Sequence, residues 1–381
     1  MKAQLALRMK YRLAAVRKRH YVPHSSGARA RAKFPFIGQS GGGLSSLSIM
    51  VFTNAAVCGN IGFMKYRRCG RSGILLPEIS LGLWHNFGAG DERAQNAAII
   101  GRALELGICH FDLADNYGPP PGSAEERFGS LLQHEFAGHR DEMFISTKAG
   151  HLMWPGPYGD WGSRKHLIAG LDQSLRRMKL DYVDVFYHHR PDADTPLEET
   201  IEALVQIVRS GKALYIGLSK YPAAAFNRAC AMLAEARVPC LLHQYRYNLL
   251  DRSCETGMLP ATREQGCGSI VFSPLAQGML TGKYLGTPAL PAGSRAERTD
   301  SIFLDADKVA ADAARVAAYQ AIAAEAGMPL TQLALRWLLQ RNGVSSVLIG
   351  ARTVAQLEDC AAASGQEALD GELMERIDSA I

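Results

Sequence analysis

Short apolar runs alternate with amphipathic stretches along this chain from residue 64 to its end. A short apolar run bounded by polar or turn residues is typical of a buried strand, whereas apolar positions three and four residues apart are typical of a helix. The pattern predicts a β-hairpin near residues 65–77, followed by eight strands. These strands are expected at residues 78–83, 109–113, 143–147, 182–187, 213–217, 240–243, 268–272 and 346–349.

Helices are expected between these strands, and two of them end at glycines. Gly107 and Gly211 stand where the helical periodicity stops, and glycine commonly follows the last turn of a helix. Strands that alternate with helices imply a parallel sheet with helical crossovers. The sequence therefore predicts an α/β fold, a (β/α)8 TIM barrel with an N-terminal β-hairpin cap. The most clearly marked helices span residues 97–106, 197–208, 305–326 and 331–340.

The first 63 residues differ in composition from the rest. They carry ten Lys or Arg and no Asp or Glu, and a charge-free run rich in Gly and Ser follows Lys33. We expect residues 1–63 to be an extension that is disordered or not part of the mature protein, and residues 64–381 to form the barrel domain. The interpretations are a true start at Met64, an Arg-rich targeting segment, or a signal peptide or anchor. The apolar stretch at 47–58 is too short for a membrane span, so no membrane partner and a cytoplasmic location are expected.

Charge and cysteine content exclude further classes of protein. Residues 64–381 hold 32 basic and 37 acidic side chains, a net charge of −5, which gives no basic footprint for nucleic acid. The eight cysteines include no Cys-x-x-Cys pair, so neither a metal site nor a disulfide framework is predicted. No Gly-x-Gly-x-x-Gly turn follows a predicted strand, which disfavours a Rossmann domain.

Polar and ionisable residues directly follow several predicted strands. Asp112 and Tyr117 lie in FDLADNYG at 111–118, Lys148 ends FISTK at 144–148, and His188 and His189 follow YVDVFY at 182–187. Positions at the carboxyl ends of barrel strands face the active site. Because side chains alternate along a strand, His188 and His189 should point to opposite sides, so only one of them is expected in the site.

Several motifs resemble the aldo-keto reductase superfamily, and within it the branch of the bacterial L-glyceraldehyde 3-phosphate reductases and the potassium-channel β subunits. The resemblance runs from residue 64 to the C terminus and does not cover residues 1–63. The matching motifs are SLGLWHNFG at 80–88, FDLADNYG at 111–118, MWPGPYG at 153–159, FSPLAQG at 272–278 and SVLIGA at 346–351.

The resemblance implies a catalytic tetrad of Asp112, Tyr117, Lys148 and His189. Reduction of a carbonyl needs a proton donor as well as a hydride, and a tyrosine is a weak acid at neutral pH. Lys148 would lower the pKa of Tyr117 and stabilise the phenolate, while Asp112 would hold Lys148 in place. His189 would polarise the carbonyl oxygen. Taken singly, the same residues have ordinary interpretations, as a loop tyrosine, a solvated lysine and a turn carboxylate.

The resemblance also implies an NADP(H) cofactor across the mouth of the barrel. Phe272 would stack on the nicotinamide beside Trp84, and Ser219 and Gln244 would bind its carboxamide. The resemblance also places Lys220 and Gln277 among the cofactor contacts, although arginine or asparagine is commoner at the position of Lys220. The pyrophosphate contacts implied are Ser273, Leu275, Lys283 and Arg295. The 2′-phosphate contacts implied are Gly350, Arg352, Gln356 and Asp359, although Cys360 replaces a usual asparagine near the adenine.

The function implied is NADPH-dependent reduction of a small aldehyde, phosphorylated aldehydes included, by a homo-oligomer. Residues 149–161 can wall a substrate pocket with aromatic side chains or simply pack on the barrel, and Asp115 is expected to be a turn residue. Arg190 and Arg164 are either substrate-phosphate ligands or ion-pair partners. The alternatives are a cofactor-binding regulatory subunit or redox sensor, and a Schiff-base aldolase that uses Lys148.

Overall fold

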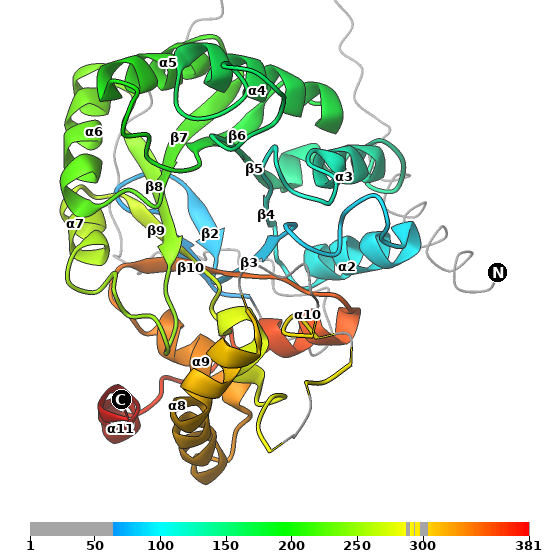
Figure 1. Ribbon diagram of the computed structural model, residues 1–381, viewed down its shortest axis with the longest axis vertical. Helices are drawn as coiled ribbons and strands as arrows, with labels where there is room; N and C mark the ends of the chain where they lie inside the picture. The colour runs from blue at the N-terminus through cyan, green and yellow to red at the C-terminus, as the bar shows by residue number, and fades with distance from the viewer. Residues whose placement is uncertain (1–63, 287–289, 293, 298–303, 381) are drawn as a thin grey trace, which may run out of the picture. The chain divides into compact units, whose positions relative to one another are not determined.

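The computed structural model describes residues 64–286, 290–292, 294–297 and 304–380. Eight parallel strands close a barrel in the order β10-β3-β4-β5-β6-β7-β8-β9, with helices outside it (Figure 1). Each predicted barrel strand is present, which confirms the predicted (β/α)8 fold. The strands are β3 (Ile79–Gly82), β4 (His110–Asp112), β5 (Phe144–Ala149), β6 (Val183–His188), β7 (Ala213–Ser219), β8 (Cys240–Arg246), β9 (Gly268–Phe272) and β10 (Val344–Ile349).

The predicted helices are also present, with ends shifted by a few residues. Gly107 and Gly211 follow α2 and α5 in the left-handed region, at φ 82° and φ 76°, as expected of glycines beyond a helix end. The α-helices are α2 (Arg93–Glu105), α3 (Ser123–His134), α4 (Arg164–Met178), α5 (Leu197–Arg209), α6 (Ala223–Glu235), α7 (Met258–Glu264), α8 (Ala306–Glu325), α9 (Leu330–Leu339), α10 (Val354–Ala361) and α11 (Gly371–Ser379). Two 3-10 helices, η1 (Arg140–Glu142) and η2 (Ala276–Thr281), lie in loops.

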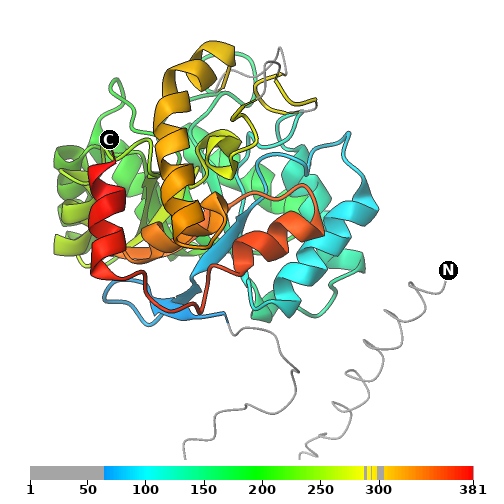
Figure 2. The same ribbon diagram turned by 90° about the horizontal axis from the view of Figure 1, so that it is seen from below.

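A hairpin of β1 (Tyr66–Arg68) and β2 (Leu75–Pro77) closes the amino-terminal end of the barrel. Its side chains Cys69 and Leu76 are buried in one cluster with the inward-facing Val185 and Tyr187 of β6. Figure 2 shows the hairpin in blue on the underside of the barrel. The predicted cap is therefore confirmed, and the opposite, carboxyl end of the strands is left for the site.

The three interpretations of residues 1–63, and the domain boundary at residue 64, concern residues outside those the structure describes. Within the described residues, none of the helices combines the length and the apolar character needed to cross a bilayer. A larger cluster of buried side chains packs the outer face of the strands against the surrounding helices. That packing fixes the strand ends on which the candidate site is built.

Candidate active site

Lys148 lies near the carboxyl end of β5 and is fully buried. Its Nζ is 2.5 Å from Asp112 Oδ2, 2.6 Å from the Leu113 carbonyl oxygen and 3.1 Å from the Tyr117 hydroxyl. An ammonium has three protons to donate, and these three contacts accept all of them. The structure thus brings Asp112, Lys148 and Tyr117 into direct contact from two strand ends and one loop.

Asp112 is fixed by more than its ion pair with Lys148. Its Oδ1 accepts hydrogen bonds from Ser146 Oγ at 2.7 Å and from Gln244 Nε2 at 3.1 Å. Ser146 is in turn 3.1 Å from His110 Nε2, and His110 Nδ1 is 2.8 Å from Ser80 Oγ. A buried charge is stabilised only when hydrogen bonds surround it, and this network of buried side chains provides those hydrogen bonds to Asp112.

The charges of the cluster favour a protonated lysine beside a protonated tyrosine. Burial lowers the pKa of Lys148, but Asp112 and Tyr117 outweigh that effect, and the net pKa is raised. Burial raises the pKa of Tyr117, Lys148 partly offsets this, and the net pKa is raised as well. The sequence led us to expect a net lowering of the Tyr117 pKa by Lys148. Lys148 does act to lower this pKa, but the opposite effect of burying the Tyr117 hydroxyl is larger.

His189 follows β6 and faces the same end of the barrel. Its ring lies edge-to-face with Tyr117 at 6.0 Å and with His151 at 4.5 Å between centroids. Burial, then the charges of Lys148 and Lys220, hold its pKa well below the usual value, so the imidazole is neutral. His189 Nδ1 is buried without a hydrogen-bond partner among the described residues.

His188 points the other way, as strand alternation predicts. Its Nδ1 is 2.6 Å from the Tyr221 hydroxyl, outside the barrel interior. Asp115 lies in a turn, also as predicted, but sequence reasoning missed its burial. It is fully buried, and burial first, then the charge of Glu125, raises its pKa well above the usual value. The sequence analysis also did not identify Glu125 as the neighbouring charge. Glu125 faces the barrel from α3 and forms an ion pair with Arg177 at 2.7 Å.

Residues expected around a nicotinamide lie at neighbouring strand ends. Ser219 ends β7 and is paired in register with Gln244 of β8. Ser219 Oγ is buried with no partner within the described part of the chain, so it fits an added polar group such as a carboxamide. The side-chain amide of Gln244 donates a hydrogen bond to Asp112, a contact that was not predicted from the sequence. Phe272 ends β9 and is partly buried, and Lys220 follows Ser219 with φ 61°.

The loop after β9 adopts an unusual backbone. Ser273, Gln277 and Gly278 have φ of 56°, 61° and 95°. Left-handed residues of this kind turn successive backbone N–H groups toward one side, which is a common way to bind anions. Arg295 donates to Gln277 and lies 5.8 Å from the Trp84 ring centroid. Leu275 lies in the same loop, and Lys283 Nζ would be 3.0 Å from a Cβ placed on Gly278.

Residues expected at the 2′-phosphate gather at the start of α10. The Arg352 backbone N–H donates to Gln356 Oε1 at 2.9 Å, and the Gln356 N–H donates to Thr353 Oγ1 at 3.2 Å. Gly350 and the Arg352 side chain are exposed beside this helix N-terminus, where a phosphate is favoured. Asp359 lies one turn farther along α10 and accepts a hydrogen bond from Gln332 through its carbonyl.

The two arginines considered for a substrate phosphate both have partners. Arg190 donates to the Gly150 carbonyl and to Asp160, each at 2.7 Å, and stacks 3.7 Å from the Trp161 ring. Arg164 pairs with Glu202 on α5. The ion-pair interpretation therefore fits both. In the 149–161 loop, Trp154 packs on His166, whereas Leu152, Tyr158 and Trp161 are exposed.

A closed eight-stranded barrel with buried acid–base groups at the carboxyl ends of its strands has the form of a barrel enzyme. Comparison with known proteins narrows this class. The aldo/keto reductase family matches residues 78–381, and the chain belongs to this family. It is therefore an oxidoreductase, of a family that generally uses NAD(P)H.

The individual relatives are of two kinds, reductases and channel subunits. The L-glyceraldehyde 3-phosphate reductase of Escherichia coli K12 is 51% identical over 302 residues, covering 78% of this chain and 87% of that protein. The corresponding protein of Escherichia coli O157:H7 is 48% identical over 324 residues, covering 84% and 93%. A probable voltage-gated potassium channel β subunit of Arabidopsis thaliana is 36% identical over 301 residues, covering 78% and 90%.

Proposed function

We propose that this protein reduces a small aldehyde to the alcohol with NADPH, using Asp112, Tyr117, Lys148 and His189. The observation that carries the proposal is the Lys148 ammonium, which contacts both the Asp112 carboxylate and the Tyr117 hydroxyl inside the barrel. A basic and an acidic group held this way suit proton transfer to a carbonyl oxygen. The cofactor supplies the hydride that goes to the carbonyl carbon.

Tyr117 is the proton donor in this proposal. Its hydroxyl is protonated at neutral pH, and its proton passes to the substrate oxygen as negative charge develops there. The phenolate that remains lies 3.1 Å from the Lys148 ammonium, which stabilises it until a proton returns from solvent. Neutral His189 can donate a hydrogen bond to the same oxygen, and its low pKa keeps a second positive charge out of the site.

NADPH is proposed over NADH because of the residues at the start of α10. A 2′-phosphate is a dianion, and both a guanidinium and a helix N-terminus favour it over a ribose hydroxyl. Arg352 is exposed there, and Gln356 holds its backbone in place. The buried Ser219 hydroxyl and the left-handed loop after β9 would hold the nicotinamide and pyrophosphate ends.

The substrate proposed is a small aldehyde, with glyceraldehyde 3-phosphate among the candidates because two relatives are named for it. The seven cysteines within the described residues are all free thiols, which supports the expected cytoplasmic location. We also keep a homo-oligomer as part of the proposal.

The aldolase alternative is disfavoured by the same geometry. A Schiff-base lysine must be neutral to attack a carbonyl, whereas Lys148 has a raised pKa and donates to three partners. The regulatory alternative rests on the potassium-channel relative. It is disfavoured by His189, because the resemblance implies that such subunits typically lack this histidine.

The test measures oxidation of NADPH by purified protein with a panel of small aldehydes that includes glyceraldehyde 3-phosphate. We expect turnover in the wild type and a loss of at least about hundredfold in Tyr117→Phe, with NADPH binding retained. Tyr66→Phe, in the hairpin at the other end of the barrel, is the matched control. Tight NADPH binding without turnover of any aldehyde would instead favour the regulatory protein.

A further inference from the structure

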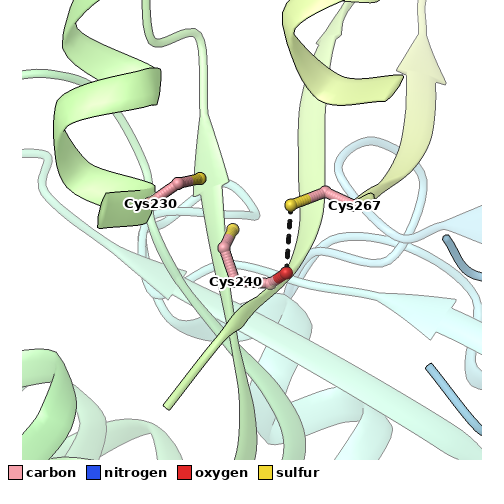
Figure 3. A group of neighbouring side chains, drawn as sticks. All are labelled: Cys230, Cys240 and Cys267. Atoms are coloured by element: carbon pink, nitrogen blue, oxygen red, sulfur yellow. Dashed lines mark hydrogen bonds between the residues drawn. The ribbon is translucent and has the colours of Figure 1, made fainter. Parts of the chain in front are cut away.

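Three buried thiols meet at the amino-terminal end of the barrel, far along the strands from the candidate active site. Cys230 lies on α6, Cys240 is the first residue of β8, and Cys267 directly precedes β9. Their Sγ atoms all lie within 4.8 Å of one another. Figure 3 shows the three side chains converging from a helix and two strand ends.

The spacing of these thiols is close to that of a thiolate metal site. Zinc binds sulfur at about 2.3 Å, so tetrahedral thiolate ligands lie roughly 3.8 Å apart. Starting from separations within 4.8 Å, each sulfur needs to move by well under ~1 Å to reach that geometry. The hydrogen bonds now made are weak thiol contacts, such as Cys267 Sγ donating to the Cys240 carbonyl at 3.1 Å.

A positive charge lies beside the cluster. The Arg71 side chain crosses over Gly266, the residue before Cys267, so closely that a Cβ on Gly266 would be 2.0 Å from Arg71 Nε. Arg71 also donates to the Gln265 carbonyl at 3.0 Å. Zinc with three thiolates has one net negative charge, and a buried charge is costly unless an opposite charge is near. Arg71 is positioned to offset it.

We propose that Cys230, Cys240 and Cys267 bind one Zn²⁺ ion, with water as the fourth ligand. Binding replaces three thiol protons with the ion, so three protons are released to solvent and no electron is transferred. The ion would join α6, β8 and β9 at the end of the barrel that serves stability rather than catalysis. The site is independent of the aldehyde reductase proposal, because none of its residues belongs to that machinery.

The experiment titrates the chelator-treated full chain with Zn²⁺ against a coloured competing chelator. The wild type should bind one ion per chain, and Cd²⁺ in its place should give a thiolate-to-metal charge-transfer absorption. Cys230→Ala and Cys240→Ala should each weaken binding by at least about tenfold. Cys254→Ala, a buried cysteine outside the cluster, is the matched control and should bind like the wild type.

Circular dichroism is used to check that each variant is folded. Cys230→Ala is the main variant, because alanine suits its helical position on α6. The proposal is overturned if the wild type binds no zinc, or if Cys230→Ala and Cys240→Ala both bind it with wild-type affinity. It is also overturned if Cd²⁺ binds without the thiolate absorption, because the ion would then lie elsewhere.

Discussion

Asp115 is a side chain whose ionisation opposes its own burial. It is fully buried, and both carboxyl oxygens lack hydrogen-bond partners among the described residues. Its pKa in the folded state is raised by burial and by Glu125, so folding favours the protonated form. The stability that Asp115 contributes is fully present below its pKa in the unfolded chain. It is lost as the pH rises through its pKa in the folded protein.

We therefore expect Asp115→Asn to be stabilised relative to the wild type at neutral pH, and the difference to shrink toward acidic pH. Asparagine has the same shape and does not ionise. Urea unfolding at several pH values between 4 and 8 measures the difference. A gap that stays constant over this range would show that Asp115 does not titrate as its burial implies.

At the residue scale, sequence patterns predicted which side chains would meet but not all of their protonation. Strand alternation correctly separated His188 from the barrel interior, because the period of two is local. The net pKa of Tyr117 and the burial of Asp115 depend on how completely other elements enclose them. That enclosure is a property of the closed barrel and has no local signal.

At the scale of single elements, the β6–β7 pair carries a tight contact under the candidate site. A Cβ added to Gly217 on β7 would lie 2.2 Å from the ring of Tyr187 on β6. The Tyr187 ring centroid is 5.7 Å from Lys148 Nζ. Strand β7 thus needs a glycine there because the aromatic ring fills the space where a side chain would stand.

Gly217→Ala should lower the free energy of unfolding by about 1–3 kcal/mol or more and should also lower kcat, because Tyr187 must move. The double variant Gly217→Ala with Tyr187→Leu should recover part of the lost stability. Gly371→Ala, at a position with open space around it, is the control. Equal urea midpoints for Gly217→Ala and the wild type would contradict this packing.

The amino-terminal end of α10 carries the cofactor preference in our proposal. Arg352→Gln removes the guanidinium but keeps the backbone N–H that binds Gln356. We expect the KM for NADPH to rise about tenfold or more, because a charge-assisted hydrogen bond contributes about 1.5–3 kcal/mol. The KM for NADH should change little. Parallel rises for both cofactors would mean that Arg352 does not read the 2′-phosphate.

The barrel strands were predictable as elements because each is a short apolar run flanked by turn residues. Helices α10 and α11 follow the last strand and have a weaker helical pattern, so neither was predicted separately. The left-handed φ of Ser273 and Gln277 was likewise not predictable, since neither residue is glycine. Tertiary contacts such as the bond from Arg295 to Gln277 determine that loop.

At the scale of the whole molecule, contacts between distant segments produced what the sequence did not predict. The spacing of the cysteines argued against a metal site, yet barrel closure brings Cys230, Cys240 and Cys267 together. The same fold encloses several histidines as neutral rings, His110, His188 and His243 fully and His151 in part. The pKa of His110 and of His151 is lowered to about 4, and that of His188 and of His243 to about 3, in each case mainly by burial.

These histidines should make the protein sensitive to acid well before its carboxylates are protonated. Their folded pKa values are depressed, so the stability they contribute is present above the unfolded value of about 6.5 and is lost as pH falls toward 4 and 3. Each such histidine contributes at most about 1.4 kcal/mol per pH unit to the slope of the unfolding free energy against pH.

His243 offers the cleanest test. It stacks on Phe226 at 4.1 Å, and its Nδ1 is 3.0 Å from Thr262 Oγ1, whose own proton goes to the Met258 carbonyl. His243→Phe keeps the stack and leaves Thr262 bonded, so stability at neutral pH should be nearly unchanged. In this variant the slope of the unfolding free energy against pH, between pH 6.5 and 4, should decrease by the equivalent of about one bound proton. His134→Phe, at the surface, should leave that slope as in the wild type. If His243→Phe keeps the full wild-type slope, the acid sensitivity arises from other groups.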